Sequence, residues 1–184
     1  MPRFSTGSES VFPTVQANGR SHQSYLNPTG ESVVRVEAMY DAILIPYDGN
    51  DESQRAAEHG IDLAASLGAS VHALYVIDLP GAPRTVYVRD DEEQLREDYR
   101  EYGEEVTAQV CEIAGEAGID CTTTIRTGSP AEEIVAHAEE EGLDAIVMGS
   151  AYKGKFGAVL GGASDKVVRT SPVPVVTTRM TVDD

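Results

Sequence analysis

The sequence predicts an α/β fold, in which a five-stranded parallel sheet carries helices on both faces. Five short apolar runs of strand length follow residue 39, and segments with helical spacing or helix-start signals lie between them. Parallel strands need long crossover connections, usually helices, so this alternation favours a parallel sheet covered on both sides.

The first two strands and two helices follow from the spacing of apolar residues. A buried strand is expected at Ala42–Pro46, and a helix from about Asp51 to Leu67, which Gly68 stops. The second strand is expected at Val71–Ile77. A long acidic helix then runs from about Asp90 to Ala117, and its many carboxylates are expected to form a solvated outer face.

A third strand and a third helix follow in the same way. Alternating residues predict a strand at Cys121–Arg126. Ser129 then offers an N-cap, Pro130 suits the first helical turn, and Glu132 completes a capping box. The apolar run within Asp144–Gly149 predicts the fourth strand.

A short helix is expected to begin near Ser164, and the fifth strand is expected at Val175–Thr178. Open parallel sheets bind ligands at the carboxyl ends of their strands, near the switch in strand order. If the first and fourth strands are neighbours, Tyr47 and Asp48 lie beside Gly149 at that edge.

The domain boundaries follow from composition. Residues 1–38 are rich in small polar residues and show no period of 2 or 3.6, so we interpret them as a flexible N-terminal leader. Residues 39–180 are expected to form one domain, and residues 181–184 a C-terminal tail. Met39 as the biological start and a genuine tail before it are both open alternatives.

Charge excludes some classes of partner. The chain has 31 acidic against 14 basic residues and a net charge of -17, which repels nucleic acid and anionic membrane surfaces. Abundant carboxylates and scarce lysine suggest a halophilic source.

No signal peptide or membrane span is visible, and Cys111 and Cys121 lack the spacing of a zinc site or disulfide framework. We therefore expect reduced thiols, no metal and a cytoplasmic location.

No catalytic constellation emerges from the histidines. His59 and His137 fall within predicted helices and are expected at the surface, whereas His72 on a strand is expected to be structural. No Ser/His/Asp set or paired metal motif converges in the expected topology, so enzymatic turnover is not predicted.

The segment Gly149–Arg179 differs in charge from the rest of the chain. It holds all three lysines, Lys153, Lys155 and Lys166, and Asp165 as its only acid. A glycine-containing loop between a strand and a helix directs backbone N–H groups at one place, which suits a phosphate. The alternative is a flexible loop that lysines keep soluble, since isolated glycine patterns are weak signals.

Five motifs between Met39 and Arg179 are typical of one known family. They are Tyr40–Gly49, His72–Asp78, Gly128–Pro130 with Ile134-Val135, Asp144–Gly149 and Pro172–Val176. In these motifs the chain resembles the universal stress protein family. The resemblance implies a Rossmann-like, adenine nucleotide alpha hydrolase-like fold, a homodimer formed through the last strand, and membership of either the ATP-binding or the nucleotide-free branch.

The glycine signature of the ATP-binding branch is degenerate here. Gly149 fits its first glycine, but Tyr152 stands at the second. Gly161 matches the third one residue early, and Gly162 stands where a Ser or Thr is expected. ATP binding and a nucleotide-free protein are therefore both open.

The resemblance assigns the nucleotide contacts position by position. Next to the adenine and ribose it places Pro46, Tyr47, Asp48, Val76, Met148 and Gly149. Next to the phosphates it places Gly161, Gly162, Ala163 and Ser164, to which charge adds Lys153 and Lys155. Each has a structural alternative: Val76 and Met148 as core, Pro46 as a strand end, and Asp48 as a cap of the following helix.

The sequence thus indicates a cytoplasmic, dimeric stress-response module that binds ATP or another adenine nucleotide weakly at the loop from Gly149 to Ser164. The alternative is a nucleotide-free dimeric interaction or regulatory protein, with its dimer contact at Val175–Thr178. A nucleotide-dependent enzyme related by fold is disfavoured by the missing acid and base groups.

Overall fold

The structure is a computed structural model that describes residues 15–17, 20–26, 32–35, 39–78, 90–150 and 162–179. The chain divides into two compact units, Met1–Met39 and Tyr40–Asp184. The expected roles of residues 1–38 as a leader and of residues 181–184 as a tail stay predictions. Each unit is described by itself.

The first unit contains an antiparallel sheet of β1 (Val15–Ala17), β2 (Arg20–Leu26) and β3 (Ser32–Arg35), in the order β1-β2-β3. No regular element was predicted for these residues. The strands escaped prediction because their residues are mostly polar, and backbone pairing between strands needs no apolar alternation. The flexibility of this leader stays a prediction.

The second unit confirms the predicted fold class. Its sheet has five strands in the order β6-β5-β4-β7-β8, and every pairing is parallel. The first and fourth strands of the predicted domain, β4 and β7, are neighbours, as the site hypothesis required. The strands are β4 (Ala42–Pro46), β5 (Ser70–Ile77), β6 (Cys121–Thr127), β7 (Ala145–Ser150) and β8 (Val175–Arg179).

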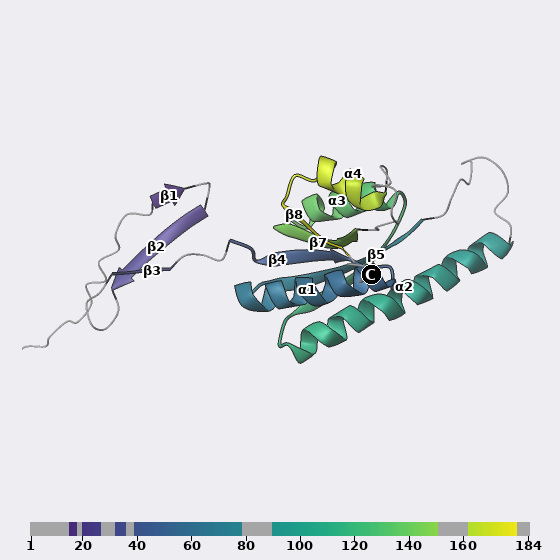
Figure 1. The fold of residues 1–184 in the computed structure, drawn as a ribbon, viewed down its shortest axis with the longest axis horizontal. Helices are drawn as coiled ribbons and strands as arrows, with labels where there is room; N and C mark the ends of the chain where they lie inside the picture. Colours follow the sequence, from purple (N-terminus) through teal and green to yellow (C-terminus); the bar gives the residue numbers. More distant parts are fainter. Residues whose placement is uncertain are drawn as a thin grey trace, which may run out of the picture. The chain divides into compact units, whose positions relative to one another are not determined.

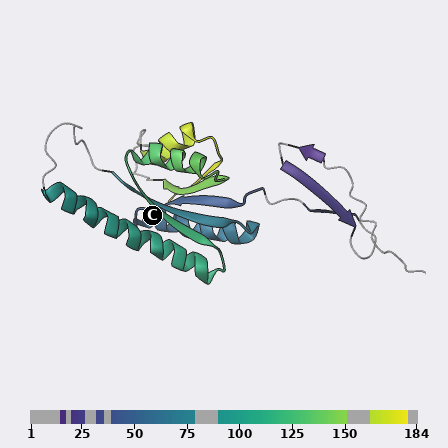
Figure 2. The ribbon, with the colours of Figure 1, turned by 180° about the vertical axis from the view of Figure 1, so that it is seen from behind.

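Two helices cover each face of this sheet (Figures 1 and 2). The helices α1 (Asp51–Leu67) and α2 (Asp90–Glu116) pack on one face, and α3 (Pro130–Glu140) and α4 (Ala163–Thr170) on the other. Side chains alternate between these layers, so Ile43 and Ile45 of β4 enter the α1 and α2 core while Leu44 enters the opposite one. Every predicted boundary in this unit lies within one or two residues of the observed one.

Helix α1 begins at a turn built by two side chains. The Asn50 side chain accepts a hydrogen bond of 2.7 Å from the Ser53 N–H, which makes Asn50 the N-cap. The Asp48 carboxylate in turn accepts bonds from the Asn50 backbone N–H and side-chain amide, at 3.2 and 2.9 Å. Asp48 therefore supports the cap but is not the cap.

Helix α3 begins where it was predicted, but without the predicted capping box. Ser129 is the N-cap and Pro130 occupies the first turn, yet the Ser129 side chain makes no capping hydrogen bond. The neighbouring Glu133 instead receives a 2.6 Å bond from the Arg126 guanidinium of β6, which also binds Glu140 at 2.6 Å. Arg126 thus ties α3 to the edge strand β6 both near the start of the helix and at its last residue.

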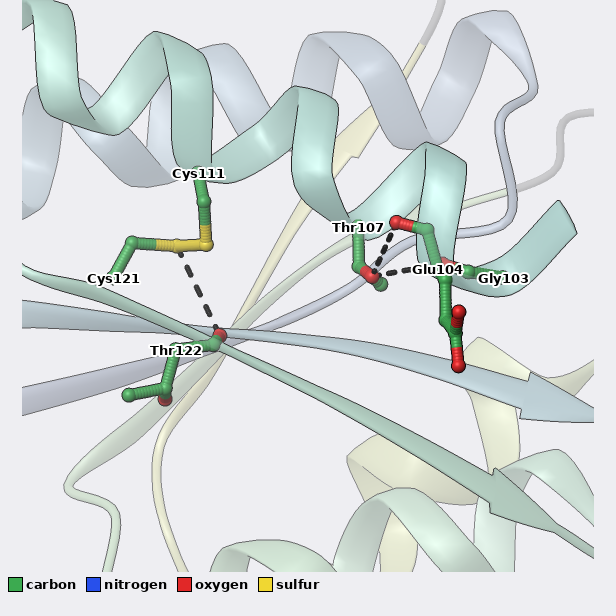
Figure 3. Close-up of a disulfide and its surroundings, with 6 residues drawn as sticks. All are labelled: Gly103, Glu104, Thr107, Cys111, Cys121 and Thr122. Atoms are coloured by element: carbon green, nitrogen blue, oxygen red, sulfur yellow. Dashed lines mark hydrogen bonds between the residues drawn. A yellow bond between two sulfur atoms is a disulfide. The ribbon is translucent and has the colours of Figure 1, made fainter. Parts of the chain in front are cut away.

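The two cysteines form a disulfide, so the expectation of reduced thiols is wrong (Figure 3). Cys111 lies in α2 and Cys121 begins β6, and their Cα atoms are 5.2 Å apart, a separation that a disulfide spans. A tight turn brings them together, held by a 2.9 Å bond from the Ile119 N–H to the Ala114 carbonyl oxygen. Motif spacing missed the pair because the contact depends on how α2 turns back onto β6.

His137 is buried, so its predicted surface position is wrong. Only 3% of its surface is exposed, whereas His59 of α1 is exposed as predicted. The ring of His137 on α3 lies near the ring of the half-buried His72 on β5, with ring centroids 6.2 Å apart. Burial first, and then the charge of Arg126, lowers the pKa of His137, so the ring is neutral at pH 7.

Candidate functional site

A cleft of about 390 Å³ opens at the carboxyl ends of β4, β5 and β7. It lies where the strand order reverses between β4 and β7, which is where open parallel sheets place their ligands. Its volume is within the usual range for small-molecule sites. Residues of these strands and of the four helices described in this unit line it.

The end of β4 supplies Pro46, Tyr47 and Asp48. Tyr47 is 8% exposed, and its backbone N–H donates to the Leu74 carbonyl oxygen at 2.8 Å, so the end of β4 is held against β5. Burial raises the pKa of Tyr47, which keeps its hydroxyl protonated and able to donate. Asp48 is exposed, and its carboxylate has acceptor capacity beyond its two bonds to Asn50.

The end of β7 supplies Met148 and Gly149. Met148 is only 6% exposed, so it contributes to the core as well as to the cleft wall. Gly149 passes so close to the first turn of α1 that a Cβ atom would lie 2.7 Å from the Glu52 carbonyl oxygen and 3.0 Å from the Ser53 nitrogen. Glycine at this position lets β7 and α1 approach each other.

The β5 side of the cleft is apolar except at its outer end. Leu74 is buried and Val76 half-buried, and both face Ile134 of α3. Asp78 follows the strand and is exposed. This wall suits the flat, mostly apolar face of an aromatic base better than a charged group.

The opposite side of the cleft ends at the N-terminus of α4. Gly162 is the N-cap and makes no side-chain capping bond, and Ala163 and the half-buried Ser164 form the first turn. The first backbone N–H groups of a helix have no partner within it and carry partial positive charge. This end of the cleft therefore favours a negatively charged group, to which the Ser164 hydroxyl can donate.

The structure brings together most of the residues that the resemblance assigned to a nucleotide site. Those lining the cleft are Pro46, Tyr47, Asp48, Val76, Met148, Gly149, Gly162, Ala163 and Ser164. The remaining three, Lys153, Lys155 and Gly161, lie outside the described residues. A contact between ligand and any of these residues stays a prediction.

The cleft carries negative charge in the part that the structure describes. Asp48, Glu52 and Asp78 line it, whereas its described lining contains no lysine or arginine. Within the described lining, attraction for a polyphosphate can come from backbone N–H groups and from the α4 dipole.

Sequence reasoning missed Tyr99, the residue through which α2 reaches the cleft. Tyr99 is one of the apolar residues that recur at helical spacing along α2, but such a stripe does not indicate which turn of a helix passes a site at the sheet edge. Asn50 and Ser53 were also missed as lining residues, although they lie at the start of α1, which follows β4 in the chain.

No group of three or more His, Cys, Asp or Glu residues that could hold a metal ion occurs in the described part of the chain. The helices within the same residues include none that is both long and apolar enough to cross a membrane. None of the histidines from His59 onward lines the cleft.

The doubly wound sheet and the cleft at its switch in strand order define an open α/β domain. The family model described as "Universal stress protein family" matches residues 39–179, and the chain belongs to this family.

Its relatives are similar over most of their length. A universal stress protein of Methanocaldococcus jannaschii is 36% identical over 144 residues, which cover 76% of this chain and 82% of that protein. Universal stress protein UspA from Lactobacillus plantarum superimposes with a TM-score of 0.68 at 25% identity, covering 78% of this chain and 100% of that one. The same fold, at a TM-score of 0.54 and 22% identity, occurs in a universal stress protein from Archaeoglobus fulgidus in complex with dAMP, covering 76% of this chain and 98% of that one.

Proposed function

We propose that the cleft binds an adenine nucleotide and that the protein acts in stress response by binding this ligand, without catalytic turnover. One observation carries the proposal: residues from three strand ends and from the α4 N-terminus, assigned separately by sequence motifs, line a single cleft. The complex of the Archaeoglobus fulgidus relative with dAMP supports the choice of an adenine nucleotide.

The chemistry of the two ends orients the ligand. The base lies at the apolar β5 side, next to Val76, and the ribose hydroxyls donate to Asp48. The phosphates lie at the α4 N-terminus, next to Gly162 and Ser164. Binding is weak, because three carboxylates line the cleft and the glycine signature is degenerate.

Lys153 and Lys155 are proposed to supply the missing positive charge. Replacing both by alanine is expected to weaken ATP binding by about 1.5 to 3 kcal/mol, the range for hydrogen bonds to charged groups. The loss should shrink as the salt concentration rises, because salt screens the lysines from the phosphates. Isothermal titration calorimetry at low and high salt measures both effects.

The matched control removes two cations elsewhere. Lys166 and Arg169 are exposed on α4 and do not line the cleft, so the double variant Lys166→Ala/Arg169→Ala should bind ATP nearly as well as the parent. If both double variants lose the same amount of ATP affinity, the effect comes from net charge alone. No binding to the parent protein at millimolar ATP would refute the proposed function.

The proposed assembly is a cytoplasmic homodimer joined through β8. This strand is at one edge of the five-stranded sheet and pairs only with β7 among the described strands, so its outer edge is open to a second copy. The disulfide is at odds with the reducing cytoplasm of most mesophiles, and the location therefore rests on the family resemblance.

Placing a lysine at the exposed Thr177 of β8 is expected to convert the dimer to a monomer, because two copies would bring like charges to the shared edge. Light scattering at several protein concentrations measures the mass. Thr122→Lys is the control, since Thr122 is exposed on β6 at the opposite edge. A monomeric parent protein, or equal dissociation in both variants, would contradict this interface.

A nucleotide-free interaction protein is the second candidate. The carboxylates that line the cleft favour it, since they oppose a polyphosphate. Mass spectrometry of small molecules released from the purified protein distinguishes the two candidates.

A further inference from the structure

The N-terminal half of α2 exposes an apolar stripe. Leu95, Tyr99 and Tyr102 are 46%, 40% and 42% exposed, although the same stripe is buried further along the helix at Val106 and Val110. The N-terminal part of α2 extends beyond the ends of the strands (Figure 1).

Contacts with the strand ends nevertheless hold this part of α2 in place. The Tyr102 hydroxyl donates to the Asp48 carbonyl oxygen at 3.1 Å. The Tyr102 ring also meets the buried Tyr75 ring edge to face, with centroids 5.7 Å apart. Gly103 lets the helix approach Tyr75, since a Cβ atom there would overlap that ring. The turn of α2 that carries Tyr99 is thus fixed relative to the end of β4.

Tyr99 lies between two hollows. On one side it lines the cleft, and on the other it lines an outer hollow of about 300 Å³ that it shares with Leu95, Asp98 and Tyr102. It is the only residue common to both linings within the described part of the chain, and the only α2 residue that reaches the cleft there.

We propose that Tyr99 is a base-contact residue of the cleft, whose ring stacks on the base of the bound nucleotide. This inference rests on the proposed function and adds a base contact to it. α2 packs against β5 and β6, on the opposite side of the cleft from the α4 N-terminus where the phosphates are placed. The part of a nucleotide nearest to α2 is therefore its base, and every base offers a flat π-face to an aromatic ring.

Base contact and phosphate contact can be separated by the choice of ligand. Tyr99→Ala should raise the dissociation constants of adenosine and of ATP by the same factor, roughly 5- to 150-fold. The binding of inorganic triphosphate should be unchanged. Tyr99→Phe retains the ring and should bind adenosine like the parent protein. Leu95→Ala, which alters only the outer hollow, should also leave adenosine binding unchanged.

A spectroscopic test reads the contact directly. The chain contains no tryptophan, so Tyr99→Trp introduces a single indole at the proposed contact. Adenosine should quench its fluorescence by stacking on it, in a saturable manner and at the concentrations that calorimetry gives for binding. Leu95→Trp places the same reporter one turn earlier on the same stripe, and there adenosine should cause no saturable quenching.

Three outcomes would overturn the inference. If Tyr99→Ala binds adenosine as well as the parent protein does, the proposed base contact is refuted, but nucleotide binding by the cleft is not. Equal weakening in Tyr99→Ala and Leu95→Ala would indicate a general disturbance of α2. If the parent protein binds neither adenosine nor ATP, the proposed function fails and the inference fails with it.

Discussion

Replacing Gly149 by alanine is expected to lower the free energy of unfolding by about 2 to 3 kcal/mol, because a methyl group has no room between β7 and α1. The added Cβ would lie 2.7 Å from the Glu52 carbonyl oxygen and 3.0 Å from the Ser53 nitrogen. Both are backbone atoms of the first turn of α1, so relief requires the helix to move and cannot come from a rotamer change. Chemical denaturation measures the loss.

The control for this change is Gly115→Ala in α2. A Cβ atom at Gly115 meets nothing within 4 Å, so the substitution should raise the free energy of unfolding by roughly 0.5 to 1 kcal/mol through helix propensity alone. Gly149→Ala should also weaken nucleotide binding, because Gly149 lines the cleft. If Gly149→Ala were as stable as the parent protein, the close approach of β7 and α1 would not limit stability.

Reduction of the Cys111–Cys121 disulfide is expected to lower the free energy of unfolding by about 3 kcal/mol. The bond closes a loop over a sequence separation of 10, and opening it returns conformational entropy to the unfolded chain. The corresponding fall in thermal midpoint is roughly 6 to 12 °C. Thermal unfolding with and without a reductant that does not itself bind the protein measures this difference.

The double variant Cys111→Ala/Cys121→Ala is the control for the reductant. It should unfold near the midpoint of the reduced parent protein, and adding reductant should not change that midpoint further. If the thermal midpoint of the parent protein does not change on adding reductant, even though labelling shows that its thiols are free, that result would contradict a stabilising role for the disulfide.

The fold of the second unit was predictable because its signals are local. The apolar run at Ala42–Pro46, the stop at Gly68 and the proline at Pro130 each act through their immediate neighbours in the chain, and each element lies within one or two residues of its expected place. Most of the cleft was predictable for a related reason. Its residues directly follow strand ends, and parallel strands bring their carboxyl ends to one edge of the sheet.

The features that escaped prediction depend on contacts between distant elements. Whether Cys111 meets Cys121 depends on how α2 turns onto β6, and whether His137 is buried depends on the face that α3 presents to the sheet. The crossing of α2 over the strand ends decides that Tyr99 reaches the cleft.

The sequence by itself therefore determined the order and bounds of the strands and helices in the second unit, their α/β class and the sheet edge that holds the cleft. Only the tertiary structure decided the disulfide, the burial of His137, the packing reason for Gly149 and the place of Tyr99. The physical reason is that apolar periodicity encodes which face of an element is buried, whereas helix crossing and close packing decide which residues of two elements touch.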